Sequence, residues 1–113
     1  MAASISNMMV RLLSEYTGRG PTKARTYIDG DLISVVMQDN LTRGERSLVR
    51  DDQSALVLTS RRAYQNAMAK EATAHVEEIT GRKVLAFLSD NHIDPDVAVE
   101  SFVLEPEGGA VRQ

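Results

Sequence analysis

Apolar residues recur every three or four positions over the first sixteen residues of the chain. The set is Ile5, Met8, Met9, Leu12, Leu13 and Tyr16. This spacing places an apolar stripe along one side of an α-helix. Ser4 or Ser6 is expected to cap its start. Gly18 suits its end, because glycine accepts the left-handed conformation that commonly closes a helix. The pattern predicts an amphipathic N-terminal helix.

Two runs of β-branched and aromatic residues flank an Asp-Gly dipeptide. The runs cover residues 25–28 and 32–37, and Asp29-Gly30 lies between them. Asp-Gly readily adopts the positive φ angles of a tight hairpin turn. In the second run, apolar residues occupy both alternating sets of positions, which is typical of a strand covered on both sides.

A short helix is expected after the hairpin. Asn40 and Thr42 are candidate caps for a helix over residues 43–50. Gly44 weakens this prediction, since glycine costs roughly 1 kcal/mol relative to alanine inside a helix.

A longer helix is expected to follow and to end at Gly81. Asp51 and Asp52 place acidic side chains at its expected start, where the helix dipole favours them. The apolar stripe of this helix consists of Tyr64, Met68, Ala72, Val76 and Ile79.

Two further strands, residues 83–89 and 97–104, are predicted near the end of the chain, with residues 90–96 as the loop between them. A Thr-Gly-Arg triplet occurs at 17–19 and again at 80–82, each time between a helix and a two-strand unit. We therefore predict an α+β fold. Two β-hairpins form a four-stranded, mostly antiparallel sheet, packed on the N-terminal helix and the long central helix. The order of the strands stays open.

The predicted central helix is too long for a compact chain of this size. From Asp52 to Thr80 it would measure ~43 Å, whereas a compact chain of this length has a diameter of roughly 34 Å. Either the helix breaks near Thr59, or its first turns project outward. Projecting apolar side chains would favour a partner, most simply a second copy of the chain. The residues concerned are Leu56, Val57 and Leu58, and we expect a homodimer.

Composition restricts the classes of function. The net charge is −3 and the sequence pI is about 5.3, so no overall attraction to nucleic acid is expected. There is no cysteine, hence no thiolate nucleophile or thiolate metal site, which fits the cytoplasm. No stretch has the ~20 apolar residues of a membrane helix, so a role at a membrane would require docking onto a protein there. We expect one domain over residues 1–105 and a flexible tail over 106–113.

Basic residues concentrate in one region of the sequence. A docking surface for an acidic partner, or an anion site, is one interpretation of this cluster. The alternative is a solvated helix face paired with neighbouring acids. The residues are Arg43, Arg46, Arg50, Arg61 and Arg62.

Two acidic groups are candidate chemical sites. The loop containing Asp90, His92, Asp94 and Asp96 offers oxygen ligands to a hard cation, although Asp-Pro-Asp is also ordinary turn chemistry. The glutamates at 71, 77 and 78 could act in acid–base catalysis but fit a solvated helix face better. No nucleophile elbow or glycine-rich phosphate loop is present. We therefore expect no catalytic residue, no cofactor and no metal.

Several of these residues follow the pattern of a known family. Gly20-Pro21 followed by residues 25–28, and the run at 76–84 containing Glu-Ile-Thr-Gly-Arg-Lys-Val, resemble the MpsC-like family over about residues 5–105. Its name comes from a sodium-translocating system that generates membrane potential and is linked to inorganic-carbon uptake. The chain departs from the family at Arg43-Gly44 and at Ser89-Asp90.

The resemblance implies a small cytoplasmic, non-catalytic accessory subunit. Such a subunit would be peripheral to the membrane through a transporter partner, without inserting into the bilayer itself. The alternative is a regulatory domain that senses a ligand or an ion through the 90–96 loop or the arginine cluster.

Overall fold

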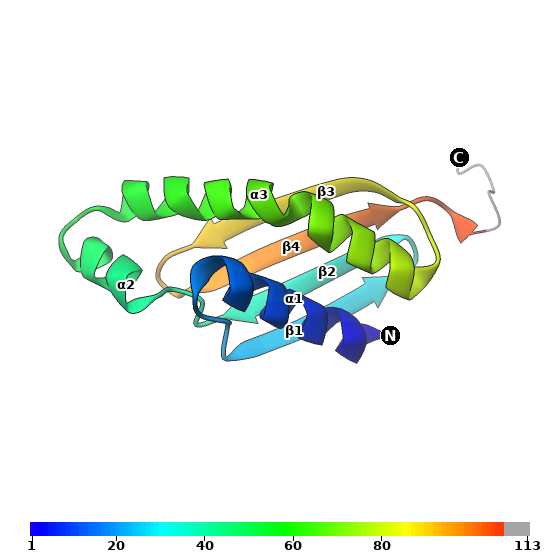
Figure 1. Ribbon diagram of the computed structural model, residues 1–113, viewed down its shortest axis with the longest axis horizontal. Helices are drawn as coiled ribbons and strands as arrows, with labels where there is room; N and C mark the ends of the chain where they lie inside the picture. Colours follow the sequence, from blue (N-terminus) through cyan, green and yellow to red (C-terminus); the bar gives the residue numbers. More distant parts are fainter. Residues whose placement is uncertain (108–113) are drawn as a thin grey trace.

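Three helices and a four-stranded sheet make up the part of the chain that the computed structural model describes, residues 1–107 (Figure 1). The elements are α1 (Ala2–Thr17), β1 (Lys23–Asp29), β2 (Leu32–Gln38), α2 (Arg43–Arg50), α3 (Ser54–Thr80), β3 (Val84–His92) and β4 (Val97–Leu104). All strand pairs are antiparallel, in the order β1-β2-β4-β3. The predicted α+β architecture is confirmed. Most of the predicted C-terminal tail, residues 108–113, lies outside the described residues.

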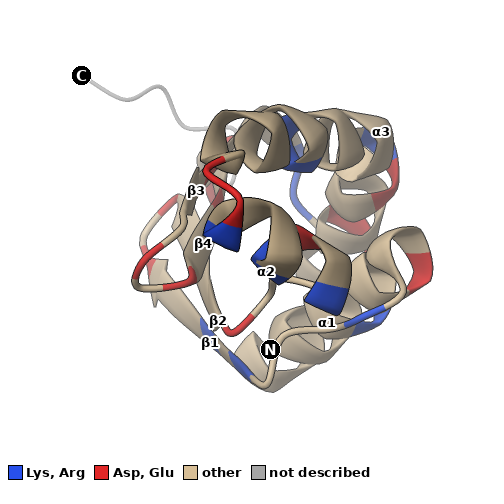
Figure 2. Ribbon diagram, turned by 90° about the vertical axis from the view of Figure 1, so that its left-hand side faces the viewer, with Lys and Arg blue, Asp and Glu red and all other residues tan. Residues whose placement is uncertain are grey.

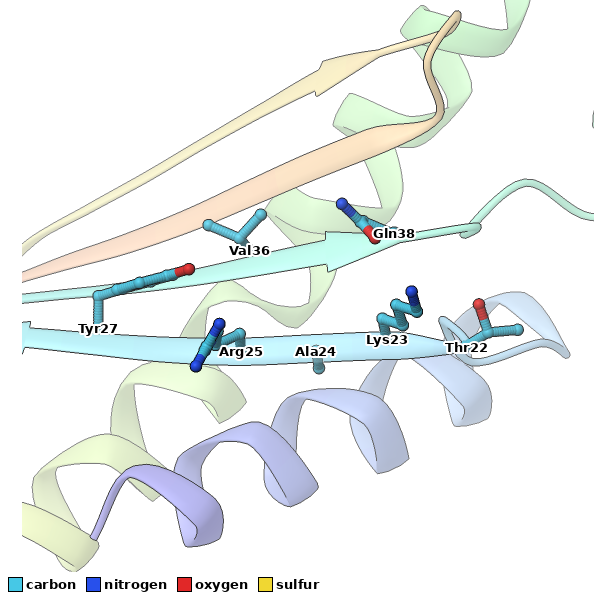
Figure 3. A pocket seen from close by; sticks show the side chains of 7 residues that line it. All are labelled: Thr22, Lys23, Ala24, Arg25, Tyr27, Val36 and Gln38. Carbon is cyan, nitrogen blue, oxygen red and sulfur yellow. The ribbon is translucent and has the colours of Figure 1, made fainter.

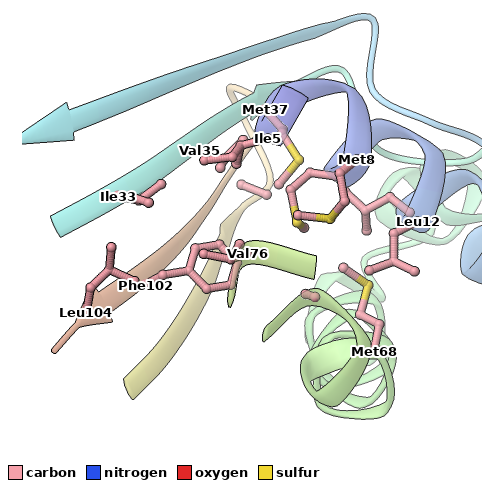
Figure 4. Packing of buried hydrophobic residues seen from close by; sticks show 14 residues of the cluster. Ile5, Met8, Leu12, Ile33, Val35, Met37, Met68, Val76, Phe102 and Leu104 are labelled. Carbon is pink, nitrogen blue, oxygen red and sulfur yellow. The ribbon is translucent and has the colours of Figure 1, made fainter. Parts of the chain in front are cut away.

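Helices α1 and α3 pack against one face of the sheet and enclose the core (Figures 1 and 4). The rings of Phe87 and Phe102 meet at a centroid distance of 5.0 Å. Because aromatic residues are few, aliphatic and methionine side chains fill most of this volume. The wholly buried members include Ile5, Met9, Ile33, Val35, Met37, Met68, Val76 and Phe102.

No helix covers the opposite face of the sheet within residues 1–107 (Figure 2). Ile33, Val35 and Met37 of β2 are buried beneath the helices. On the other side of the same strand, Leu32 is 43% exposed and Val36 is half-buried. The expectation that β2 is covered on both sides is therefore wrong for residues 1–107 of a single chain.

The Thr-Gly-Arg triplets at 17–19 and 80–82 form the same structure twice. Each glycine is left-handed, with φ of 80° and 69°. Each threonine hydroxyl donates to the carbonyl four residues earlier, at 2.8 Å. The arginine of each triplet then reaches an aspartate at one end of β2, Asp39 in the first case and Asp31 in the second. The repeat thus fastens both helix ends to the central strand.

Two predicted helix starts are wrong. Helix α1 begins at Ala2 with Met1 as its N-cap, so neither Ser4 nor Ser6 caps it. Helix α3 begins at Ser54, because Asp52 adopts a left-handed φ of 59° in the turn after α2. The acidic pair therefore lies in this turn and not in the first turn of α3.

Helix α3 is unbroken over 27 residues, and the molecule is accordingly elongated, 51 × 25 × 22 Å. Its first turns pass beyond α1 and lie against α2 (Figure 1). The predicted stripe is wrong at Tyr64, which is 39% exposed. Arg61 and Gln65 occupy the buried side instead. These two polar residues hide the apolar periodicity of the buried side. They can be buried because their side chains have hydrogen-bond partners inside the fold.

Candidate functional site

Four arginines surround one hollow at the α2 end of the molecule. Its volume is about 500 Å³, and its lining is Arg19, Asp39, Arg43, Arg46 and Arg50. The spacing of 43, 46 and 50 places three of them on one face of α2. Figure 2 shows the basic residues of α2 in blue at this end of the molecule. We call these four arginines the arginine surface.

Asp39 organises two members of the arginine surface. Nη2 of Arg19 donates to Oδ2 of Asp39 at 2.9 Å, and Nη2 of Arg46 donates to its Oδ1. Both guanidinium groups also donate to the carbonyl oxygen of Leu41. Asp39 itself follows β2 with a left-handed φ of 59°, and its amide donates to the carbonyl of Asp96. The backbone therefore fixes where the two guanidinium groups lie.

Positive charge exceeds negative charge in the hollow. The hydrogen bond from Arg19 lowers the pKa of Asp39 and outweighs burial, which raises it; hydrogen bonds from Thr22 and Arg46 lower the pKa further. Asp39 is thus ionised at neutral pH and offsets one of the four positive charges. Arg43 and Arg50 are exposed, and their side chains have no hydrogen-bond or ion-pair partner within residues 1–107. Arginine guanidinium groups bind carboxylates and phosphates, often with two parallel hydrogen bonds.

Arg61, which the sequence placed in the basic cluster, is buried. Its Nη2 donates to Oε1 of Glu45 at 2.6 Å and to the carbonyl oxygen of Asn40 at 2.5 Å. Glu45 also closes a capping box with Thr42 at the start of α2. Arg61 therefore attaches α2, which carries three arginines of the arginine surface, to α3. Arg62 is exposed on α3 and does not line the hollow.

A buried polar layer continues from this ion pair beneath α3. Nε2 of Gln65 donates to Oε1 of Glu100 and to Oδ1 of Asn91, both at 3.0 Å. Glu100 is fully buried, and its Oε2 has no hydrogen-bond partner among the described residues. Burial raises the pKa of Glu100 to about 7, although Ser89, Gln65 and the charge of Arg61 act in the opposite direction. The carboxyl group therefore titrates near neutral pH.

The candidate cation loop is shorter than predicted, since β3 continues to His92. Asp96 accepts from the amide of Leu41 at 2.9 Å and from Nδ2 of Asn40 at 3.3 Å, so it anchors the segment before α2. Nδ1 of His92 lies 2.8 Å from the carbonyl oxygen of Pro95. Asp90 and Asp94 are exposed. Over residues 1–107, no group of three or more acidic, histidine or cysteine side chains is arranged to hold a metal ion.

Other predicted residues are separated from the arginine surface. At the start of α3, Leu56 is 50% and Leu58 36% exposed, whereas Val57 is wholly buried. Glu71 accepts a hydrogen bond from the Tyr16 hydroxyl at 2.8 Å. Glu77 accepts one from the amide of Val84 at 2.9 Å. These two glutamates fasten α3 to its neighbours.

Sequence reasoning missed three residues of this region. The sequence placed Arg19 only at the end of the N-terminal helix. The repeated Thr-Gly-Arg triplet could have indicated that this arginine has a structural partner. Nothing in the sequence indicated a functional role for Asp39, whose position depends on its left-handed backbone. Glu100 alternates with Ala98 and Phe102 along β4, and this pattern could have placed it on the buried face.

Comparison with known proteins gives a family. No helix within residues 1–107 is both long and apolar enough to cross a membrane. Protein YrhF of Bacillus subtilis (strain 168), described as uncharacterized, is 24% identical over 102 residues, which cover 88% of this chain and 84% of that protein. No solved structure matches the chain. The model of the MpsC family, described as "Na+-translocating membrane potential-generating system (MpsC)", matches residues 1–106. The chain therefore belongs to the MpsC family.

Proposed function

We propose that the chain is a small, soluble, non-catalytic accessory subunit of a membrane cation- or inorganic-carbon-transport system. It works in the cytoplasm, as a homodimer, and reaches the membrane by docking onto a transporter subunit. The arginine surface is the docking site, and an acidic segment of that subunit is its counterpart. The exposed Leu56 and Leu58 are one candidate contact between the two copies.

The observation that carries the proposal is the excess of positive charge in the hollow beside α2. The chain as a whole is acidic, with a net charge of −3. Four arginines nevertheless converge on a hollow of about 500 Å³ in which Asp39 is the acidic lining residue. The side chains of Arg43 and Arg50 make no hydrogen bond to other described residues. Their N–H donors are therefore available to carboxylates of another protein. The description of the family, a Na⁺-translocating system, supports a membrane protein as that partner.

A small-anion sensor is the second candidate, because the hollow has room for an anion such as bicarbonate or phosphate. An anion that binds the native state but not the unfolded state stabilises it by RT ln(1 + [L]/Kd), and so raises the melting temperature. We expect millimolar bicarbonate and phosphate to leave the melting temperature unchanged, beyond the effect of matched chloride. A specific rise that Arg43→Glu abolishes would favour the sensor over the docking subunit.

Affinity purification from the membranes of the host organism tests the docking function. Tagged wild-type protein is incubated with gently solubilised membranes, and the recovered proteins are identified by mass spectrometry. The test variant is Arg43→Glu/Arg50→Glu, which leaves the ion pairs of Arg19 and Arg46 intact. The matched control is Arg62→Glu, an exposed arginine outside the hollow.

We expect the wild type and the Arg62→Glu control to recover one multi-span transport subunit, and the double variant to lose it. Equal recovery by all three proteins would overturn the assignment of the docking site. Recovery of the tagged chain alone, with no membrane protein, would overturn the accessory-subunit function.

A further inference from the structure

The uncovered face of the sheet carries a continuous apolar area. Three of its side chains are strongly exposed: Tyr27 at 53%, Leu32 at 43% and Leu88 at 58%. Val36, Val99 and Val103 are half-buried between them. The strand registers place Leu32 opposite Val103 and Val36 opposite Val99, so these residues adjoin one another across the sheet. We call this side of the sheet the open face.

The two central strands have the composition of strands that are covered on both sides. β2 and β4 each carry apolar residues on the helix-covered face and again on the open face. Antiparallel strands with one solvated face instead alternate apolar and polar residues. An apolar face of this kind is typical of an interaction surface. The sequence pattern therefore predicts a second layer that residues 1–107 of a single chain do not supply.

Charges at the two edges of the open face favour a second copy of the chain as the second layer. The registers place Arg25, Val36, Val99 and Asp90 in one row across β1, β2, β4 and β3. The basic residue stands at the β1 edge, and the acidic residue stands at the β3 edge. Both are exposed. The row is consequently positive at one end, apolar in the middle and negative at the other end.

The next row has the matching arrangement of apolar groups. It runs from Tyr27 through Ser34 and Ser101 to Leu88. The two serine hydroxyls lie 2.9 Å apart and share one hydrogen bond, which stays intact when the face is covered. Large apolar side chains stand at both ends of this row.

A two-fold axis parallel to the strands, above the gap between β2 and β4, turns each row end for end. A second copy related by this axis places its β3 over β1 of the first copy, and its β4 over β2. Arg25 then faces Asp90 of the other copy, Val36 faces Val99, and Tyr27 faces Leu88. Stacked sheets lie about 10 Å apart and cross at about 30°. The long arginine side chain can span this separation. In these two rows the open face is therefore complementary to itself in both charge and apolarity, whereas Asp29, in the row through Leu32 and Val103, would face Ala86 of the other copy.

The hollow in Figure 3 fits this arrangement. It has a volume of about 570 Å³ and lies along β1 and the neighbouring part of β2. Arg25, Tyr27 and Val36 are among its lining residues. The guanidinium carbon of Arg25 lies 5.8 Å from the centroid of the Tyr27 ring. In the two-fold arrangement, this hollow faces the outward side chains of β3 from the second copy, Leu88 and Asp90.

We propose that the open face is the interface of a homodimer, formed by a second copy of this chain about a two-fold axis parallel to the strands. The proposal rests on the homodimer in the proposed function and gives it a surface. It moves that surface from the first turns of α3 to the sheet. Isologous association of this kind needs one self-complementary patch, which the reversed rows provide.

A charge-exchange series on the purified chain tests the proposal. Sedimentation equilibrium over the micromolar range measures the dimer dissociation constant for the wild type, Arg25→Asp, Asp90→Arg and the double exchange Arg25→Asp/Asp90→Arg. Both substituted positions, Arg25 and Asp90, are exposed, and far-UV circular dichroism checks that each variant is folded. Leu88→Lys removes an apolar contact. Leu56→Lys/Leu58→Lys probes the start of α3 as the matched control.

We expect a wild-type dimer, at least tenfold weaker association in each single charge variant, and recovery to within threefold of the wild type in the double exchange. Leu88→Lys should also weaken the dimer at least tenfold, and Leu56→Lys/Leu58→Lys should leave it unchanged. A monomeric wild type would overturn the proposal, as would loss of the dimer in the α3 variant alone or failure of the double exchange to restore it. No membrane component is present, so these outcomes are independent of whether a transporter subunit binds the arginine surface.

Discussion

Nη2 of Arg61 on α3 lies 2.6 Å from Oε1 of Glu45 on α2, and the two side chains are only 3% and 12% exposed. This ion pair joins the helix that carries three arginines of the arginine surface to the longest helix of the fold. The same Glu45 oxygen accepts the amide of Thr42 in the capping box at 2.8 Å. The position of α2 and its three arginines therefore depends on the carboxylate of Glu45.

Replacing Glu45 with alanine should destabilise the protein strongly. The substitution leaves the Arg61 guanidinium buried without a counter-charge, which typically costs about 3–5 kcal/mol. Urea unfolding followed by circular dichroism measures the change in the free energy of unfolding. The exposed Glu78→Ala is the control and should stay within about 0.5 kcal/mol of the wild type. A loss below about 1 kcal/mol for Glu45→Ala would contradict the role given to the pair.

Glu100 should make stability fall as the pH rises toward neutrality. Its pKa is about 7 in the folded chain and 4.5 as the ordinary value. The folded state therefore holds a proton that the unfolded state has released between these two values. The stabilising contribution is complete below pH 4.5 and is lost as the pH rises through about 7.

Unfolding at pH 5 and at pH 8 measures this contribution. Between these pH values the wild type should lose on the order of 2 kcal/mol relative to Glu100→Gln, which keeps the shape of the side chain but does not titrate. Comparison with the variant cancels the contributions of other groups, including Asp39. If both proteins show the same pH dependence, Glu100 is not protonated in the folded state near neutral pH.

The sequence predicted regular elements well where one rule governed the residues. Gly18 and Gly81 end their helices as expected, and the bounds of α2 and β4 were predicted correctly. The buried side of α3 was predicted only in part, because Arg61 and Gln65 are polar residues whose partners come from distant segments. Arg61 pairs with Glu45 and Gln65 with Asn91, and sequence spacing does not indicate either pair.

The candidate site was harder to predict than the fold. Three residues of the arginine surface were identified, because basic residues concentrate in that region of the sequence. Arg19 joins them only through tertiary structure, since the Asp39 that holds it lies 20 residues away in the sequence. Arg61 looked equivalent to its neighbours because a charged residue is normally exposed.

Two glycines should respond in opposite directions to alanine. A Cβ atom at position 20 would lie 3.2 Å from both the carbonyl oxygen and a side-chain carbon of Val10, so the loop must shift away from α1. A Cβ at position 44 meets only the Thr42 hydroxyl at 3.9 Å, and alanine favours a helix over glycine by roughly 0.5–1 kcal/mol. Thermal unfolding should show a lower melting temperature for Gly20→Ala and a higher one for Gly44→Ala. Equal shifts in one direction would contradict the packing of residue 20 against α1.

Binding to membranes from the host organism tests the accessory-subunit function most directly. Purified wild type, Arg43→Glu/Arg50→Glu and the Arg62→Glu control are each mixed with cytoplasmic-side-out membrane vesicles, and the bound fraction is measured by sedimentation. We expect saturable binding of the wild type and the control that weakens with added salt, because exposed charges are screened. The double variant should bind at least tenfold more weakly. Undiminished binding of the double variant, or no saturable binding of the wild type, would contradict docking through the arginine surface.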